Sequence, residues 1–263
     1  MEIAALLVVN AVVTVLCFLA LWLISLWLKD VSFIDSWWAL GLVVTAWVSY
    51  MNAPGSPHAT ALVWLCTVWG SRLGGYLLWR WRSHGVDRRY AAILGKAQAR
   101  RGWSFAWAAL VMVFALQAPL QWIVSLPVQF GAMGTVSSLG ALAWCGIALS
   151  VTGILFETIG DWQLVRFRAK PANAGKVLDH GLWRYTRHPN YFGDACVWWG
   201  LWLIAAEAGF GLWALPGPVL MTYLLTSLSG VPTVEGHLAR SKPGYEDYIR
   251  RTSGFIPLPP RQG

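Results

Sequence analysis

The sequence has few charged residues and few cysteines. Charged residues make up 12% of its 263 positions, whereas soluble domains carry about 25%, so an ordinary soluble domain is excluded. The four cysteines lie one per apolar block, and their spacing matches no metal-binding or redox motif. The sequence also has no internal repeat, no attached soluble domain and no cluster of metal ligands, so we expect no metal site.

Long apolar blocks dominate the sequence instead. Hydrophobic residues make up 57% of the chain, and a helix of about 20 such residues crosses a hydrocarbon layer of about 30 Å. Many of the 19 tryptophans lie near block ends, where membrane interfaces favour them. We predict an all-α polytopic membrane protein with about seven transmembrane helices in a single membrane domain, 1–263. The predicted spans are 3–28, 33–51, 59–82, 104–126, 136–161, 190–206 and 210–230.

The basic residues alternate between the two sides of these spans. Seven of the 20 Lys and Arg residues lie between Arg80 and Arg101, six between Arg166 and Arg187, and five after residue 230. The connections 52–58, 127–135 and 207–209 contain none. The positive-inside rule therefore places the N-terminus outside and the C-terminus in the cytoplasm. Topology also explains the net charge of +8, so we expect no nucleic acid partner.

Ionisable residues inside the predicted spans are functional candidates, because burying charge in a membrane is costly. They are Asp35, Arg72, Glu157, Asp161 and Asp194. Glu157 and Asp161 are four residues apart and share one helix face. They form either a packing network with Arg166 and Arg168 or a ligand-binding site.

The densest polar stretch is the segment Gly181–Asp194. It combines three cationic side chains with three neutral hydrogen-bonding ones, and Pro189 stands where a helix can begin. Arginines beside the free N–H groups of a helix start favour an anionic ligand such as phosphate. The alternative is a basic loop that contacts anionic lipid. The polar residues are Arg184, Tyr185, Arg187, His188, Asn190 and Tyr191.

Two further groups carry candidate residues. In the tail, His237 lies near the predicted basic pocket, and Tyr245 and Tyr248 share a helix face. In the third span, Arg72, Tyr76 and Arg80 recur every four residues as a polar stripe. Asp35 is a candidate partner for this stripe, and Tyr76 is a candidate proton donor. The alternative is a packing network without chemistry.

The segment Gly181–Asp194, GLWRYTRHPNYFGD, resembles the signature of the steroid 5-alpha-reductase-like superfamily. The upstream segment 156–164 and the downstream segment 245–257 fit the same resemblance. It is strong over about residues 150–260 and weaker over 30–90. The most similar branch is a bacterial group with the 3-oxo-5-alpha-steroid 4-dehydrogenase C-terminal domain.

The resemblance implies a seven-helix reductase in the bacterial inner membrane. NADPH would bind on the cytoplasmic side, in the half 136–263, and a lipid-like substrate would enter from the bilayer on the side of 1–130. The enzyme would reduce a C=C bond in a steroid-like, enone or isoprenoid lipid. The cofactor-binding candidates are Glu157, Asp161, Arg168, Tyr185, Arg187, His188, Asn190, Asp194, His237, Tyr245 and Tyr248.

Two departures from the family pattern keep alternatives open. The family holds the substrate carbonyl with an acidic or amide residue and a tyrosine, and Asp35 and Tyr76 stand in for that pair here. The Arg-His-Pro motif also occurs in isoprenylcysteine carboxyl methyltransferases, which bind S-adenosylmethionine. Those enzymes carry paired glutamates in the tail, whereas this chain has Glu235-Gly236-His237, which favours the reductase. A transporter or lipid-binding scaffold is the third hypothesis, and no feature of the sequence indicates an oligomeric state.

Overall fold

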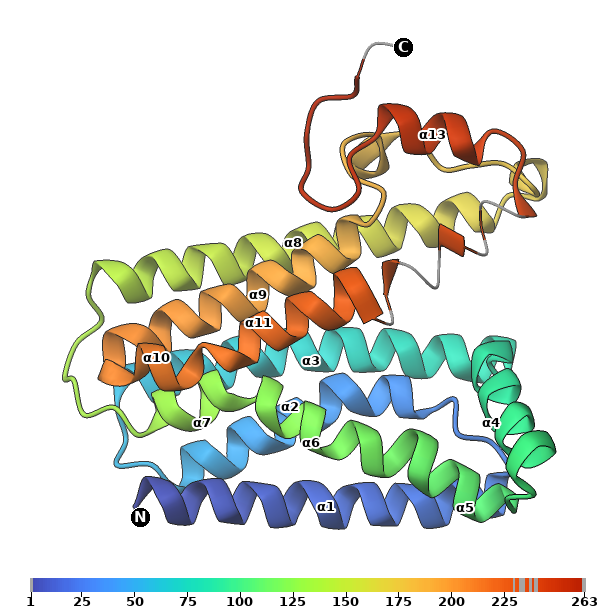
Figure 1. The fold of residues 1–263 in the computed structure, drawn as a ribbon. Helices are drawn as coiled ribbons and strands as arrows, with labels where there is room; N and C mark the ends of the chain where they lie inside the picture. The colour runs from blue at the N-terminus through green and yellow to red at the C-terminus, as the bar shows by residue number, and fades with distance from the viewer. Residues whose placement is uncertain (1, 229, 232–234, 237, 239–240, 262–263) are drawn as a thin grey trace. The chain divides into compact units, whose positions relative to one another are not determined.

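The computed structural model describes residues 2–228, 230–231, 235–236, 238 and 241–261, and they form helices and loops. The chain divides into two compact units (Figure 1). Unit 1 comprises Met1–Ala143 and Leu201–Gly217, and unit 2 comprises Trp144–Gly200 and Pro218–Gly263. Residues 201–217 also belong to unit 1.

Unit 1 is built around three long helices, α1 (Ile3–Leu28), α2 (Ile34–Asn52) and α3 (Pro57–His84). Local sequence signals set their ends: Ser56 caps α3, where its side chain accepts a hydrogen bond from Ala59 N at 3.1 Å, and Pro57 follows at the first helical position. The other helices that lie wholly in unit 1 are α4 (Arg88–Arg101), α5 (Phe105–Ala109), the π-helical η1 (Leu110–Phe114), α6 (Ala115–Val124), α7 (Leu126–Ala132), η4 (Ala206–Phe210) and α10 (Gly211–Ala214).

Helices α2 and α3 pack closely because α3 presents two glycines four residues apart. A Cβ atom at Gly70 would lie 2.8 Å from the carbonyl oxygen of Ala39, and one at Gly74 would lie 2.6 Å from Leu40 Cγ. Small residues at this spacing let membrane helices approach until their backbones nearly touch. The polar stripe predicted on α3 therefore lies on a helix that packs closely against α2.

A buried polar layer joins α1, α2 and α7 inside unit 1. Asn10 Nδ2 donates to Ser49 Oγ at 2.9 Å and to Gln129 Oε1 at 3.1 Å. Gln129 Nε2 in turn donates to Ser125 Oγ at 2.6 Å. All four side chains are buried. Such interhelical hydrogen bonds stabilise packing where no water reaches the polar groups.

Unit 2 contains α8 (Ala141–Arg168) from Trp144 onward and the start of α9 (Pro189–Ala205) up to Gly200. These two helices run antiparallel, and their backbones are in close contact at Gly153 and Gly193. A Cβ atom at Gly193 would lie 2.5 Å from the carbonyl oxygen of Gly153 and 2.7 Å from the backbone nitrogen of Glu157. The other elements are η2 (Pro171–Asn173), η3 (Gly181–Arg184), α11 (Pro216–Tyr223), which enters unit 2 at Pro218, η5 (Leu224–Leu228) and α13 (Tyr245–Arg251).

Among the residues that the structure describes, four helical segments are long and apolar enough to cross a membrane, and we therefore treat the chain as a membrane protein. They are Ile3–Leu28, Phe105–Val124, Ala141–Arg168 and Pro189–Ala214. Each corresponds to one of the seven predicted spans. The described residues of the other three predicted spans are also largely helical, as α2, α3 and, after the end of the fourth segment at Ala214, α11 and η5.

The structure contains helices in two segments that were predicted to be connections between spans. The predicted loop 83–102 contains α4, and the predicted connection 127–135 contains α7. Helix α8 continues to Arg168, well past the predicted end at residue 161, because no helix-breaking residue occurs before Pro171. Arg166 also lies over the ring of Trp162 at 4.8 Å and supports this last part of the helix.

Candidate functional site

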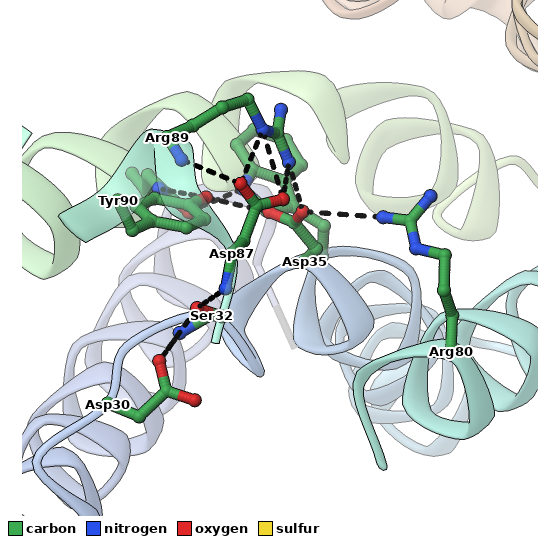
Figure 2. A network of polar contacts seen from close by, with 9 residues as sticks. Asp30, Ser32, Asp35, Arg80, Asp87, Arg89 and Tyr90 are labelled. Atoms are coloured by element: carbon green, nitrogen blue, oxygen red, sulfur yellow. Dashed lines mark hydrogen bonds and ion pairs between the residues drawn. The ribbon is translucent and has the colours of Figure 1, made fainter. Parts of the chain in front are cut away.

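Unit 1 holds a network of polar contacts centred on Asp35, at the start of α2 (Figure 2). Arg89 Nη2 donates to Asp35 Oδ2 at 2.9 Å, and the hydroxyl of Tyr90 donates to Asp35 Oδ1 at 2.7 Å. Arg80 Nη2 lies 3.8 Å from Asp35 Oδ2. We call Asp35, Arg80, Asp87, Arg89 and Tyr90 the Asp35 network. It brings together the beginning of α2, the end of α3 and the beginning of α4.

Asp87 fixes this arrangement by capping α4. Its carboxylate accepts hydrogen bonds from Arg89 N at 2.8 Å and from Arg89 Nη2 at 2.8 Å. Its own backbone N–H donates to Ser32 Oγ at 2.8 Å, and Ser32 Oγ donates to Asp30 Oδ1 at 2.7 Å. Figure 2 shows these contacts running from Asp30 to Arg89. The loop before α2 is thereby tied to the loop before α4.

The charges of the Asp35 network stabilise one another. Burial raises the pKa of Asp87, but hydrogen bonds from Arg89 outweigh burial and lower it overall. Burial would lower the pKa of Arg89, but Asp87 and Asp35 raise it above its ordinary value. Burial and the charge of Asp35 raise the pKa of Tyr90 well above its ordinary value. Tyr90 therefore keeps its proton near neutral pH.

A chain of amide and indole groups extends the network. Gln117 Nε2 lies 3.5 Å from the hydroxyl oxygen of Tyr90, to which it donates, and Gln117 Oε1 accepts from Trp38 Nε1 at 2.6 Å. Gln117 lies in α6, directly after the π-helical segment η1. Single π-helical turns are frequent at functional sites. Polar groups therefore continue from the Asp35 network into the apolar body of unit 1.

The predicted stripe on α3 meets Asp35 at Arg80, as the 3.8 Å distance shows. The ring of Tyr76 is stacked on that of Trp79, with centroids 6.0 Å apart. The shortest bonds to Asp35 come instead from Arg89 and Tyr90. These two residues lie outside the apolar blocks, so hydropathy did not indicate them as partners of Asp35. Tyr76 stays a predicted proton donor, and Tyr90 joins it as a candidate.

Unit 2 holds a second cluster, formed by Arg187, His188 and Glu235, which we call the Glu235 cluster. Arg187 Nε donates to Glu235 Oε1 at 2.7 Å, and His188 Nε2 lies 2.9 Å from the same oxygen. The His188 ring is also stacked on that of Tyr191, with centroids 5.3 Å apart. Burial raises the pKa of Glu235, but its bonds to His188 and Arg187 lower it to about 2.

Arg187 also holds the end of the chain. Its Nη1 donates to the carbonyl oxygen of Thr252 at 2.6 Å and to that of Ile249 at 3.2 Å. Backbone bonds continue the contact: Arg187 N donates to Ser253 O at 2.9 Å. The Arg-His-Pro motif therefore fastens the tail to the segment before α9. The predicted role of Arg187 and His188 as cofactor ligands stays a prediction.

The two tail tyrosines lie on one face of α13, as predicted, with ring centroids 5.7 Å apart. Both are buried, and the Tyr248 hydroxyl donates to the carbonyl oxygen of Trp183 at 2.6 Å. Burial and the charge of Glu235 raise the pKa of Tyr245 to about 12. Tyr185 is more exposed, and its carbonyl oxygen accepts from Leu258 N at 3.0 Å. His237 lies outside the described residues.

A third cluster lies between α8 and α9 and comprises Glu157, Asp161, Asn190 and Asp194; we call it the carboxylate cluster. Asn190 Nδ2 donates to Asp161 Oδ1 at 3.3 Å. Glu157, Asp161 and Asp194 are 2%, 5% and 7% exposed. The close approach at Gly193 places the Glu157 backbone against α9, next to Asp194. The structure thus brings these four predicted residues together, while Arg168 is exposed at the end of α8.

The carboxylate cluster has the chemistry of a binding site. Carboxylates accept hydrogen bonds from hydroxyl and amide groups, and the Asn190 amide both donates and accepts. Three acidic side chains at a helix contact are costly to bury in a membrane protein, so such groups mark functional sites. In the part of the chain that the structure describes, no group of three His, Cys, Asp or Glu residues has a metal-binding arrangement.

The helical fold and the apolar segments define a polytopic helical membrane protein with polar clusters in both units. Residues 21–252 match the model of a family described as a protein of unknown function, DUF1295. That match covers most of the chain, so the chain belongs to the DUF1295 family.

One similar curated protein is the uncharacterized protein C594.04c of the fission yeast Schizosaccharomyces pombe. The two are 22% identical over 224 residues, with 73% of this chain and 62% of the yeast protein covered. The chain thus spans a little over three-fifths of that relative's length. No solved structure matches the chain.

Proposed function

We propose that the chain is a membrane reductase that uses NADPH to reduce a C=C bond in a steroid-like, enone or isoprenoid lipid. The observation that carries this proposal is the carboxylate cluster, whose three acidic side chains are buried between α8 and α9. Its α9 members, Asn190 and Asp194, follow the basic segment 181–188 in the sequence. The segment resembles that of steroid 5-alpha-reductase-like proteins. Membership of the DUF1295 family, which is associated with such proteins, agrees with this assignment.

The residues of unit 2 fit the chemistry of NADPH. Asp161 and Glu157 suit ribose hydroxyls as hydrogen-bond acceptors, and Asn190 suits a carboxamide. Arg168 and Arg184 are exposed and offer positive charge for phosphate groups. Bound NADPH supplies the hydride for the reduction. Arg187, His188 and Glu235 would act by fixing the segment that leads into Asn190, since His188 and Asn190 flank Pro189.

Unit 1 supplies the candidate residues for the substrate. The Tyr90 hydroxyl donates its one hydrogen to Asp35. It could bond a substrate carbonyl oxygen or donate a proton to the substrate if the substrate oxygen took the place of Asp35 as the acceptor. Gln117 Nε2 donates to the Tyr90 hydroxyl and helps to orient it. Tyr76 on α3 is the second candidate donor. The role of the protein is to orient the reacting groups and exclude water from them.

We also propose that all seven predicted spans cross the membrane, with the N-terminus outside, the C-terminus in the cytoplasm and the bacterial inner membrane as the location. The helical state of α2, α3 and α11 supports the three spans beyond the four apolar segments. The connections 52–58, 127–135 and 207–209, which contain no Lys or Arg, support the orientation.

A direct activity assay tests the reductase. Purified protein in nanodiscs is mixed with NADPH and a panel of enone lipids, and loss of absorbance at the nicotinamide band is followed. We expect NADPH oxidation that depends on the lipid and forms the saturated product, detected by mass spectrometry. Failure of every enone, isoprenoid and steroid-like lipid to produce oxidation above the lipid-free rate would contradict the proposal.

The two tyrosine candidates are separated by paired substitutions. If Tyr90 is the acid, Tyr90→Phe should reduce turnover about 100-fold or more while NADPH affinity is unchanged. Tyr76→Phe should then have a small effect, and the reverse result would assign the acid to Tyr76. Tyr50→Phe, on the same helix as Asp35, is the control for loss of a hydroxyl. Normal turnover in both test variants would exclude both tyrosines.

A further inference from the structure

Helix α4 has one face turned into unit 1. Its residues Leu94 and Ala97 are buried in a core cluster that also contains Phe18, Phe33 and Phe114. The Asp87 cap and the bonds of Arg89 to Asp35 fix the start of the helix. Figure 1 shows α4 running across one end of the helix bundle of unit 1. The helix is therefore a fixed surface element of that end.

The rest of α4 is strongly basic. Arg88, Lys96, Arg100 and Arg101 are exposed, and none of them forms an ion pair with a residue that the structure describes. Asp87 is the one acidic residue between positions 83 and 104, and its carboxylate is bound by Arg89. Lys96 and Arg100 are four residues apart, a spacing at which like charges destabilise a helix. An external anion would remove that repulsion.

The end of α4 lies beside residues typical of a membrane surface. The Arg101 guanidinium lies 4.8 Å from the ring centroid of Trp103, and the Trp103 and Trp107 rings are 6.3 Å apart. Trp107 is 51% exposed. The apolar segment Phe105–Val124, long enough to cross a membrane, begins four residues after α4 ends. Tryptophans at the start of such a segment lie at headgroup level, which places this end of α4 at the same level.

We propose that α4 binds anionic phospholipid headgroups through Lys96 and Arg100. Ile93 lies on the same helix face, three residues before Lys96 and seven before Arg100, and it is 40% exposed. An apolar side chain in a basic stripe suits the boundary between headgroups and acyl chains, as in interfacial amphipathic helices. This combination favours a lipid over a soluble anion. The inference is independent of the reductase proposal.

Thermal unfolding in neutral detergent tests this assignment. We expect dioleoyl phosphatidylglycerol to raise the melting temperature of the wild-type protein far more than dioleoyl phosphatidylcholine, and salt to reduce the effect. The double variant Lys96→Gln with Arg100→Gln should need roughly 10- to 30-fold more phosphatidylglycerol for the same shift, since each basic residue near an anionic surface contributes about 1 kcal/mol. Glutamine has a helix propensity similar to that of lysine and arginine, so α4 should stay folded.

The matched control removes two charges from the tail. Arg250→Gln with Arg261→Gln has the same change in net charge and should keep the wild-type response to phosphatidylglycerol. An equal response of the α4 variant and wild type would overturn the proposal, as would equal stabilisation by the two lipids. Stabilisation by inorganic phosphate as strong as that by phosphatidylglycerol would also overturn it, because the surface would then bind free anions.

Discussion

Glu235→Ala should lower the free energy of unfolding by about 3 kcal/mol, the lower end of the range for breaking a buried ion pair. The side chains of Arg187 and Glu235 are 12% and 18% exposed, so the substitution leaves a largely buried guanidinium without its carboxylate. His188 loses its contact at the same time. A loss of this size should lower the melting temperature by several degrees in a chain of this length.

The matched control is an exposed pair in the same unit. Asp247 and Arg250 are 64% and 73% exposed, and exposed pairs contribute about 0–1 kcal/mol. Asp247→Ala should therefore change the melting temperature little. Equal effects of the two alanine substitutions would contradict the role of Glu235 as the anchor of the tail. Hydrogen exchange adds a local measure, because the Leu258 amide bonded to Tyr185 should lose protection in Glu235→Ala alone.

The same cluster gives a pH dependence with a defined sign. The pKa of Glu235 is lowered to about 2 in the folded protein, below its ordinary value of about 4.3. Its contribution to stability is therefore complete above the ordinary value and is lost as the pH falls toward 2. Wild type should lose more stability than Glu235→Ala across this interval. Parallel acid titrations of the two proteins would contradict the assignment.

Gly193→Ala should have an effect of similar size, about 3 kcal/mol, by forcing α8 and α9 apart. The new Cβ would lie 2.5 Å from the Gly153 carbonyl oxygen and 2.7 Å from the Glu157 backbone nitrogen. Both are backbone atoms, so no side-chain rotation can relieve the contact. The separation should also break the bond between Asn190 and Asp161, at 3.3 Å, and weaken NADPH binding.

Gly75→Ala is the control for this effect. Gly75 is also a helical glycine, but a Cβ there would have no atom within 4 Å. Alanine has a higher helix propensity by about 1 kcal/mol, so this variant should be as stable as wild type or slightly more stable. A stable Gly193→Ala protein with normal NADPH affinity would contradict the close packing of α8 on α9 and its role in the carboxylate cluster.

Hydropathy was sufficient to predict the long apolar helices of this protein, because a membrane-crossing helix needs a long apolar run. The predicted first span, 3–28, has the bounds of α1. Hydropathy was not sufficient to predict α4, α7 or the final turns of α8. These segments are short or polar, and their helical state depends on caps such as Asp87 and on packing such as that of Leu94.

The carboxylate cluster was predictable in part for a similar reason. Glu157 and Asp161 are four residues apart and therefore share a helix face, and charged residues in apolar blocks are easily recognised in the sequence. The partners of Asp35 were not predictable, because Arg89 and Tyr90 reach it through the fold of the loop before α4. The position of Glu235 in the tail was known from the sequence, but its hydrogen bond to Arg187 was not predictable, because the two residues are 48 positions apart.

The central claim is that unit 2 binds NADPH, and ligand-dependent thermal stabilisation tests it most directly. Detergent-purified protein is heated with NADPH, NADH or S-adenosylmethionine at one common concentration, set at about 100 times the dissociation constant of NADPH, where a bound ligand adds roughly 2.7 kcal/mol to stability. We expect stabilisation by NADPH, weaker stabilisation by NADH, and a reduced NADPH effect in Asn190→Ala and Arg168→Ala. Stabilisation by S-adenosylmethionine alone would contradict the account and assign the chain to the methyltransferases.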